Sequence, residues 1–173
     1  PIFDDWAVLP GQGLYYNPDM IFPNGRRRID GYCTDVVTDL AVEWLTKKRK
    51  DGQPFMMMVQ HKAPHRHWQP APRHLGLYDD VEIAEPDNLF DNYSTRTTAA
   101  QIQDMEIATT LTPHDLKLSA QGRLNPAQLE AWESVYQPKN AAFNASRGQM
   151  SEAEIVQWKY QRYLKDYLRC IKA

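Results

Sequence analysis

The chain has 173 residues, with 20 Lys and Arg side chains against 22 Asp and Glu, and a formal net charge of -2. This length is typical of one domain or of a part of a larger one, and a hydrophobic content of 42% is enough to fill a core. The near balance of charges argues against a nucleic-acid-binding protein, which usually carries a strong basic excess. No apolar run approaches the roughly 20 residues that a membrane-spanning helix needs.

The ends of the chain resemble cuts. It starts at Pro1 without a Met, shows no signal-peptide pattern, and stops at Ala173 inside a predicted helix. We therefore expect an excerpt that is incomplete at both ends. Cys33 and Cys170 are too few for a disulfide framework, and either one bridge or two free thiols would fit.

The first part of the chain predicts mostly loop and then a helix. Residues 1–30 are rich in Pro, Gly and Asn, which predicts a loop with one short strand. Within it, Arg26–Arg28 is a basic run that we interpret as a solvated face rather than as an anion contact. Apolar residues recur at helical spacing from Val36 to Lys48, so we predict a helix there, capped by Thr34 or Asp35.

A continuous apolar run, Phe55–Val59, follows this helix after a turn that contains Gly. A helix, a turn and then such a run predict a buried strand of a mostly parallel sheet. The three neighbouring Met side chains of this run are better explained by core packing than by a soft-metal site, because adjacent residues of a strand point to opposite faces. The predicted fold class is therefore α/β, a mostly parallel sheet flanked by helices, with long loops.

The rest of the chain predicts three more helices. We expect a short one over residues 99–109, and another that begins with the capping pattern Asn125–Gln128 and stops at Pro138. The last helix begins with the capping box Ser151–Glu154. Its tyrosines repeat at helical spacing, and we expect them to be core residues rather than a ligand platform.

The side chains that suit chemistry lie just after the predicted strand. In open α/β sheets, ligands bind beyond the carboxyl ends of strands, so Lys62 and His65 are well placed to meet an anion. Pro64 fixes its own backbone and makes the turn between them rigid. Lys suits sulfate or phosphate oxygens, and His can protonate a leaving oxygen near neutral pH. Together these residues indicate the cleavage of an anionic ester.

Two other interpretations of this stretch stay open. It can be a surface turn whose imidazole groups are all satisfied by hydrogen bonds. It can also hold a metal ion through His61, His65 and His67, although zinc sites usually recruit a carboxylate or Cys, and none is close in the sequence. We therefore favour the interpretation without a metal.

The segment Gln53–His65 resembles the middle of the type I sulfatases, which belong to the alkaline-phosphatase-like superfamily. The shared pattern is a Pro-Phe pair, an apolar strand and a His-Lys-Ala-Pro-His turn, followed here by Trp68-Gln69-Pro70. The resemblance covers roughly residues 15–173 and is nearest to bacterial sulfatases that act on sulfated glycans, including the N-acetylglucosamine-6-sulfatase-like group. It implies a partial alkaline-phosphatase/sulfatase-like fold, with residues 1–173 as an internal part of a single sulfatase catalytic domain.

The resemblance also implies roles for the residues of the turn. His65 would be the catalytic residue that contacts the sulfate ester and helps the leaving oxygen to depart. Lys62 would bind the sulfate or the substrate, and His61, Arg66 and His67 would line the substrate pocket. The intact enzyme would be a sulfuric ester hydrolase that removes sulfate from a sulfated carbohydrate or an aryl sulfate.

Two parts of the family's machinery do not match this chain. Type I sulfatases use a formylglycine made from Cys or Ser in a Cys/Ser-x-Pro/Ala-x-Arg motif, which neither Cys33 nor Cys170 fits. They also bind calcium through Asp pairs, and Asp4-Asp5 lacks the apolar strand that should precede such a pair. We therefore expect the nucleophile and the calcium ligands outside these residues, and no turnover by the chain alone.

Two other functions are weighed against a sulfatase. A phosphodiesterase or phosphatase of the same superfamily would carry more His and Asp metal ligands than this sequence shows. A non-catalytic glycan-binding module would use aromatic side chains such as Trp68, Tyr78 and Trp132. Only the resemblance bears on location, and it implies a periplasmic or extracellular protein, while the oligomeric state cannot be read from the sequence.

Overall fold

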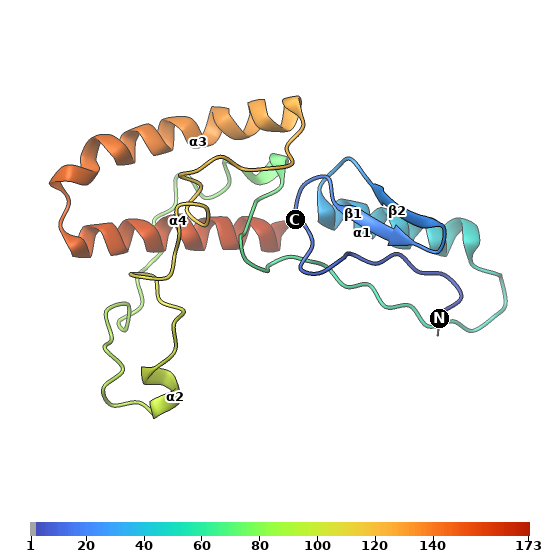
Figure 1. Cartoon of the computed structure of the whole chain (residues 1–173), viewed down its shortest axis with the longest axis horizontal. Coiled ribbons are helices and arrows are strands. Elements are labelled where there is room, and N and C mark those ends of the chain that lie inside the picture. The colour runs from blue at the N-terminus through green and yellow to red at the C-terminus, as the bar shows by residue number, and fades with distance from the viewer. Residues whose placement is uncertain (1–2) are drawn as a thin grey trace.

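The computed structural model describes residues 3–173 as a β-hairpin and four α-helices joined by long loops. The elements in chain order are strands β1 (Asp19–Phe22) and β2 (Gly25–Arg28) and helices α1 (Cys33–Glu43), α2 (Thr98–Gln101), α3 (Pro126–Ser146) and α4 (Glu152–Lys172). Single turns of other helix types lie at Trp44–Lys48, Pro72–His74 and Arg147–Gln149. The α3–α4 pair forms one end of the molecule and the hairpin with α1 forms the other (Figure 1).

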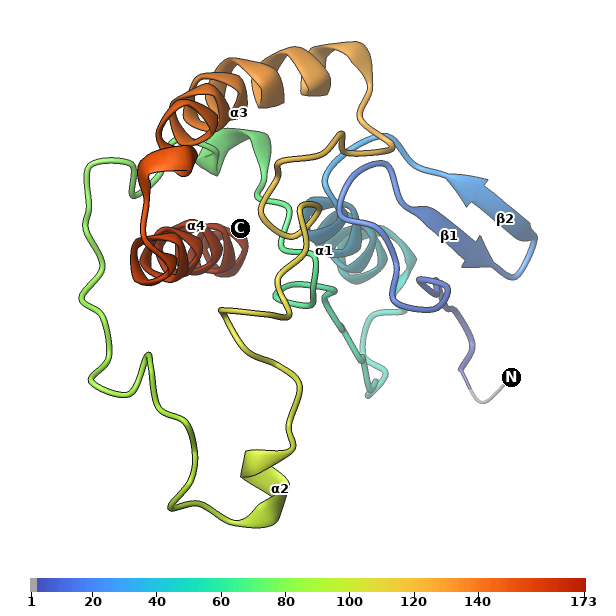
Figure 2. The same cartoon turned by 60° about the vertical axis from the view of Figure 1, so that its left-hand side comes forward.

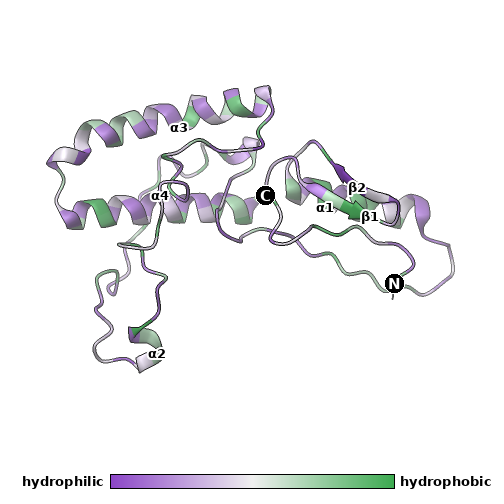
Figure 3. Cartoon of the chain, in the orientation of Figure 1, coloured by the Kyte–Doolittle hydropathy of each residue, from purple (hydrophilic) through white to green (hydrophobic). Residues whose placement is uncertain are grey.

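β1 and β2 form an antiparallel hairpin in which Asp19 lies opposite Arg28 and Phe22 opposite Gly25. Gly25 has a φ of 124°, which side chains rarely adopt, and this explains the glycine at the turn. All four residues of β2 are exposed, as the solvated-face interpretation of its arginines predicts. Figure 3 shows the contrast between the hydrophobic residues of β1 and the hydrophilic β2. The sequence predicts one strand in this region, and the structure has two.

Helix α1 begins at Cys33 without a side-chain cap from the residue before it. The predicted cap at Thr34 or Asp35 is wrong, because both residues already lie in the first helical turn. Asp35 is nevertheless favourable there, since a negative charge suits the positive end of the helix dipole. The predicted end of the helix is right, because α1 continues as a π-helical turn as far as Lys48.

The buried strand predicted over Phe55–Val59 is wrong. This segment has no regular secondary structure, and the side chains of Phe55, Met56 and Met58 are 48%, 69% and 60% exposed. The only sheet within residues 3–173 is the β1–β2 hairpin, so no neighbouring strand pairs with the segment or covers it. The described residues therefore show neither the core packing predicted for the Met side chains nor a mostly parallel sheet.

The helix predicted over residues 99–109 shrinks to the four residues of α2. A side chain competes with the backbone in the later part of the predicted helix. The hydroxyl of Thr110 accepts a 3.0 Å hydrogen bond from the N–H of Glu106 and donates to the carbonyl oxygen of Asp104. Helix α2 lies at the tip of a long excursion that extends away from α3 and α4 (Figure 2).

Both predicted capping boxes are present. At the start of α3, the Asn125 side chain accepts a 2.9 Å hydrogen bond from the N–H of Gln128, whose side chain accepts one of 2.9 Å from the N–H of Asn125. Ser151 and Glu154 make the same reciprocal pair at the start of α4. The caps satisfy N–H groups that have no partner inside the helix.

No helix within residues 3–173 is both long and apolar enough to cross a membrane.

Pro138 does not end α3, which runs on to Ser146. A proline inside a helix removes a backbone hydrogen bond and costs roughly 3 kcal/mol. Packing of the later turns against α4 offsets this cost, since the rings of Phe143 and Trp158 stack with their centroids 3.6 Å apart. The predicted end is therefore wrong because tertiary packing overrides the local signal.

Aromatic rings connect the two ends of the molecule. Tyr16 meets Tyr32 and Trp132 edge-on, with ring centroids 5.5 Å and 6.0 Å apart. Trp68 lies 4.6 Å from Tyr163 of α4, and both belong to the same hydrophobic core. The core role predicted for the aromatic stripe of the last helix is confirmed at this tyrosine.

A network of buried charges supports the pair of long helices. Asp166 on α4 accepts hydrogen bonds from the hydroxyl of Tyr136, at 2.6 Å, and from Arg169, at 2.7 Å. Its second oxygen lies 3.9 Å from the Nζ of Lys117, which is also fully buried. Buried charges are tolerated when they are paired in this way.

Cys33 and Cys170 are both buried free thiols. Of the two possibilities that the sequence left open, one bridge or two free thiols, the structure has two free thiols.

Candidate functional site

The turn after the Met-rich segment borders a cavity of about 260 Å³. Lys62, His65, Arg66 and His67 line it together, so four of the five predicted site residues meet there. The other lining residues come from the loop before β1, from the end of the same turn segment and from one later loop: Gln12, Gly13, Leu14, Tyr15, Gln69 and His114. Half of the ten lining residues carry a Lys, Arg or His side chain, and none of them is acidic.

Three buried tyrosines hold the turn and the segment after it by the backbone. Each hydroxyl donates to a carbonyl oxygen: Tyr15 to His65 at 2.6 Å, Tyr16 to Pro70 at 2.5 Å, and Tyr32 to Gln69 at 2.9 Å. Burial raises the pKa of all three hydroxyls well above the ordinary value, so they remain neutral donors. Side chains of the buried core therefore fix the position of the turn.

The ammonium group of Lys62 lies among groups that favour a cation without neutralising it. Its Nζ donates to the carbonyl oxygen of Gln12 at 2.9 Å and lies 4.7 Å from the centroid of the Tyr15 ring. Burial lowers the pKa of this ammonium group. Since no carboxylate bonds to it, its charge is available to an anion in the cavity.

His65 has one ring nitrogen engaged and one available. Its Nδ1 lies 2.6 Å from the carbonyl oxygen of Arg66. Because a carbonyl oxygen only accepts, Nδ1 must carry the proton in this arrangement. Within residues 3–173 the Nε2 of His65 has no hydrogen-bond partner, so this atom can meet a ligand.

Arg66 lines the cavity, but most of its donors already have partners. Its Nε and Nη2 donate to the two carboxylate oxygens of Asp115, at 2.7 Å and 2.5 Å, and Nη2 also donates to the carbonyl oxygen of Thr110, at 3.0 Å. A bidentate pair of this kind fixes the guanidinium in one orientation. Arg66 therefore anchors the turn to the loop that carries Asp115.

His67 shares the same carboxylate. Its Nδ1 lies 2.5 Å from Oδ1 of Asp115, and its ring meets that of His114 edge-on at 4.7 Å between centroids. Burial, followed by the neighbouring His67, lowers the pKa of His114. The cavity thus has three imidazole groups along its wall, one of which is bonded to a buried carboxylate.

His61 does not join the other predicted site residues. Its side chain is exposed and does not line the cavity. Within residues 3–173 no three His, Cys, Asp or Glu side chains gather as metal ligands. The interpretation of His61, His65 and His67 as metal ligands therefore finds no support, and the described residues do not fit the calcium that the resemblance implies.

Sequence reasoning missed Asp115 and His114. The signal for Asp115 was a Thr-x-x-Asp spacing, which is a capping pattern. The structure forms this pattern: Oδ2 of Asp115 accepts from the N–H of Thr112 at 2.8 Å, and its own N–H donates back to the Thr112 hydroxyl at 3.3 Å. Local spacing can find this turn, but only the fold shows that the carboxylate meets residues 66 and 67.

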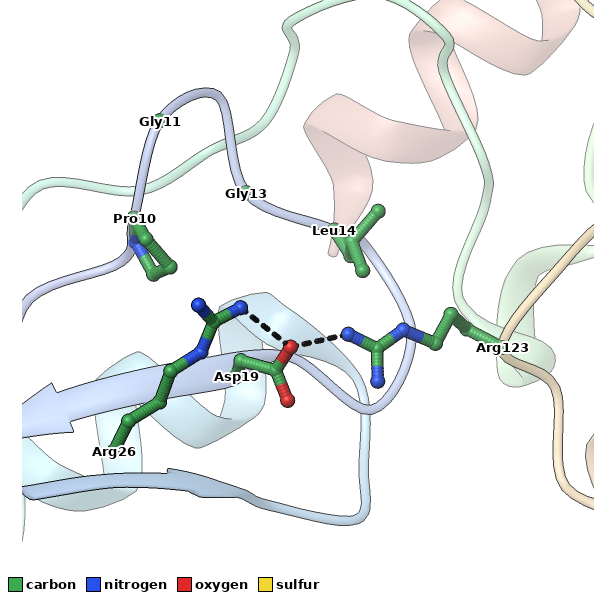
Figure 4. A pocket seen from close by; sticks show the side chains of 7 residues that line it. All are labelled: Pro10, Gly11, Gly13, Leu14, Asp19, Arg26 and Arg123. Atoms are coloured by element: carbon green, nitrogen blue, oxygen red, sulfur yellow. Dashed lines mark hydrogen bonds and ion pairs between the residues drawn. The ribbon is translucent and has the colours of Figure 1, made fainter.

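A second cavity, of about 340 Å³, lies between the loop Pro10–Leu14 and the β-hairpin (Figure 4). There Asp19 accepts hydrogen bonds from Arg26, at 2.9 Å, and from Arg123, which precedes α3. The hydrogen bond from Arg123, followed by that from Arg26, lowers the pKa of Asp19. Because both guanidinium groups already share one carboxylate, we interpret this cluster as a structural link between β1 and the start of α3.

The chain is similar to sulfatases along nearly its whole length. It is 39% identical over 191 aligned residues to the N-acetylglucosamine-6-O-sulfatase of Bacteroides thetaiotaomicron, an alignment that covers 99% of this chain and 34% of that relative. Over 82 residues it is 32% identical to the N-acetylglucosamine-6-sulfatase of Homo sapiens, which covers 44% of this chain and 14% of that protein.

The structural comparison agrees with the sequence comparison. The solved structure of BT4656 in complex with its substrate D-glucosamine-2-N,6-O-disulfate matches with a TM-score of 0.90 and 38% identity, covering 98% of this chain and 38% of that one. No protein-family model matches the chain. The chain thus spans about a third of the length of the bacterial relative that it matches.

Proposed function

We propose that this chain, which belongs to the sulfatase family, is part of an enzyme that removes sulfate from an amino sugar. One observation carries the proposal: Lys62, His65 and His67 of the sulfatase-like turn converge on a cavity whose lining includes no acidic residue. The bacterial relative is named N-acetylglucosamine-6-O-sulfatase and the human one N-acetylglucosamine-6-sulfatase, and the solved neighbour has a glucosamine with two sulfates as its substrate. A 6-O-sulfated glucosamine is therefore the proposed substrate, in preference to an aryl sulfate.

The charges of the cavity suit this chemistry. When the bond between sulfur and the sugar oxygen breaks, negative charge builds on the departing oxygen and is shared by the sulfate oxygens. Lys62 supplies a point charge that binds the sulfate. His65, when protonated at both nitrogens, donates from Nε2 to the departing oxygen and returns to the neutral ring. The Tyr15 hydroxyl supports this by holding the backbone of His65.

The proposed enzyme also needs a nucleophile and calcium ligands, and the described residues do not supply them. Neither Cys33 nor Cys170 fits the formylglycine motif, and no acidic cluster within residues 3–173 suits calcium, so we assign the nucleophile and the calcium ligands to other parts of the whole protein. The exposed segment Phe55–Val59 would pair there with strands of a mostly parallel sheet. By the same family resemblance, we place the whole protein in the periplasm or outside the cell.

The two competing functions have less support. The relatives reported above are named sulfatases, which favours a sulfate ester over the phosphate ester of a phosphatase or phosphodiesterase. A glycan-binding module would present exposed aromatic rings, but Trp68 and Trp132 are 6% and 5% exposed and belong to the core. Tyr78 is half-buried and is not accompanied by either of them at the surface.

The direct test is release of sulfate from N-acetylglucosamine-6-sulfate by the whole protein that contains this chain. We expect saturable release, no hydrolysis of 4-nitrophenyl phosphate, and a higher KM in Lys62→Ala because the sulfate loses its charged partner. Lys47→Ala removes an exposed lysine at the end of the helix that continues α1 and serves as the matched control. Hydrolysis of the phosphate ester without any release of sulfate would contradict the proposal.

A further inference from the structure

We infer that Asp115 is a positioning residue of this site, which fixes the ring of His67 and leaves its Nε2 as the atom that meets the substrate. The role of Asp115 in catalysis rests on the proposed function, whereas the contacts between Asp115 and His67 do not depend on it. Asp115 lies on a loop 48 residues further along the chain, and it does not line the cavity itself. It can therefore act only through the residues that it holds.

The carboxylate of Asp115 is held from several sides. Oδ1 accepts from Nε of Arg66, at 2.7 Å, and is bonded to Nδ1 of His67, at 2.5 Å. Oδ2 accepts from Nη2 of Arg66, at 2.5 Å, and from the N–H and hydroxyl of Thr112, at 2.8 Å and 2.7 Å. The side chain is 0% exposed, so water does not compete for these bonds. A carboxylate with this many fixed donors has one orientation.

The charge state of Asp115 decides which nitrogen of His67 carries the proton. Burial alone would raise the pKa of Asp115, but the hydrogen bonds from Arg66, Thr112 and His67 together hold it well below its ordinary value. An ionised carboxylate only accepts hydrogen bonds, so Nδ1 of His67 must be the N–H. In the neutral ring the lone pair then lies on Nε2, which has no hydrogen-bond partner within residues 3–173.

This arrangement gives His67 a definite function in the cavity. Its neutral ring presents a proton acceptor there, and its protonated ring presents a donor whose charge is balanced by Asp115. The group facing the ring edge-on is His114, whose lowered pKa favours the neutral form, so no second cation opposes a charge on His67 from that side. Arg66, which shares the carboxylate, keeps that carboxylate in place.

The first test measures the tautomer in the unmodified whole protein. Ring nitrogen shifts of ¹⁵N-histidine-labelled protein, with the His67 signal identified by its loss in His67→Gln, report which nitrogen is protonated. We expect neutral His67 to carry its proton on Nδ1. A proton on Nε2 would overturn the inference, and this readout requires no enzymatic activity.

The second test is Asp115→Asn. Three donors, Nη2 of Arg66 and the N–H and hydroxyl of Thr112, would hold the amide oxygen at the Oδ2 position. The NH₂ group then takes the Oδ1 position, where it replaces the acceptor of Arg66 Nε, faces Nδ1 of His67 and favours the opposite tautomer. We expect kcat for sulfate release to fall by about 10²-fold or more while KM stays within a few-fold, the pattern typical when a proton-transfer group is disturbed. Asp35→Asn makes the same change in the exposed bidentate pair with Arg73 and should leave both constants unchanged.

The outcomes separate this inference from the proposed function. A His67 proton on Nδ1 in a protein without sulfatase activity would refute the proposed function and leave the role of Asp115 in fixing the ring intact. An active sulfatase in which Asp115→Asn keeps the wild-type kcat would refute the positioning role alone. If Asp115→Asn does not fold, the tautomer of the unmodified protein still decides the question.

Discussion

The hydroxyl of Tyr15 donates a 2.6 Å hydrogen bond to the carbonyl oxygen of His65, 50 residues further along the chain. The ring of the same tyrosine faces the ammonium group of Lys62, 4.7 Å from its centroid. One buried side chain therefore holds both residues that we assign to the sulfate ester. Its ring is in turn stacked on Tyr32, with the centroids 5.9 Å apart, so the site rests directly on the aromatic core.

Replacing Tyr15 by Phe tests this link. The ring contact with Lys62 remains, and only the hydroxyl is lost, which leaves the His65 carbonyl without its donor. We expect the free energy of unfolding to fall by about 1 kcal/mol, measured by urea denaturation. Tyr160→Phe is the matched control, because its hydroxyl bonds to the Ala84 carbonyl at an exposed site. Equal losses in the two variants would contradict a special role for Tyr15.

The buried carboxylate of Asp166 should be the most sensitive charge of the α3–α4 pair. Asp166→Asn leaves Lys117 buried without a countercharge and removes one of the two carboxylates that pair with Arg169, the other being Asp79. Breaking a buried ion pair typically costs about 3–5 kcal/mol. Urea denaturation should show a loss of this order. The exposed pair of Asp35 with Arg73 should contribute about 0–1 kcal/mol by the same measurement. A loss in Asp166→Asn no larger than in Asp35→Asn would refute the role of the network.

The pKa of Asp115 predicts an acid-side change in stability. Its folded-state pKa is lowered from the ordinary value of 3.8, so its contribution to stability is fully present well above that value and is lost as the pH falls through the folded-state pKa. The difference in the free energy of unfolding between wild type and Asp115→Asn should therefore shrink as the pH falls below about 4. A difference that grows as the pH falls below about 4 would contradict the ionised, hydrogen-bonded carboxylate.

The two cysteines should be chemically inert in the folded protein. Burial raises the pKa of the Cys33 thiol to about 11 and that of the Cys170 thiol to about 12, so neither forms the reactive thiolate near neutral pH. At pH 8 we expect a thiol reagent such as Ellman's reagent to leave both unmodified until denaturant is added. Rapid reaction of either thiol in the native protein would show that the core is open at that position.

Local signals in the sequence were reliable at the two capping boxes, but not at the start of α1, where the cap predicted at Thr34 or Asp35 does not form. The capping boxes at Asn125 and Ser151 form as predicted, because their partners are three residues away. Pro138 was misleading because the stacking of Phe143 on Trp158 decides where α3 ends. The strand over Phe55–Val59 failed for a related reason: an apolar run forms a strand only where another strand lies beside it.

At the candidate site, too, the sequence predicted residues that are neighbours in the chain and missed those that come from distant segments. The sequence identified the turn and its cations, because Pro64 and the neighbouring basic residues are adjacent in the chain. It did not reveal Tyr15 or Asp115, which reach the turn from about 50 residues before and after it. It also placed both His65, as the catalytic residue, and His61, as a lining residue, at the substrate pocket, whereas only His65 of the two lines the cavity.

The most direct measurement is kcat/KM for sulfate release from N-acetylglucosamine-6-sulfate by the whole protein and its His65→Ala variant. Loss of a general acid lowers the rate by about 10²- to 10⁴-fold, and we predict a fall in this range. His74→Ala, on the 3-10 turn Pro72–His74 and outside the cavity lining, should keep the wild-type value. An unchanged kcat/KM in His65→Ala would contradict the claim that this turn presents His65 to the sulfate ester.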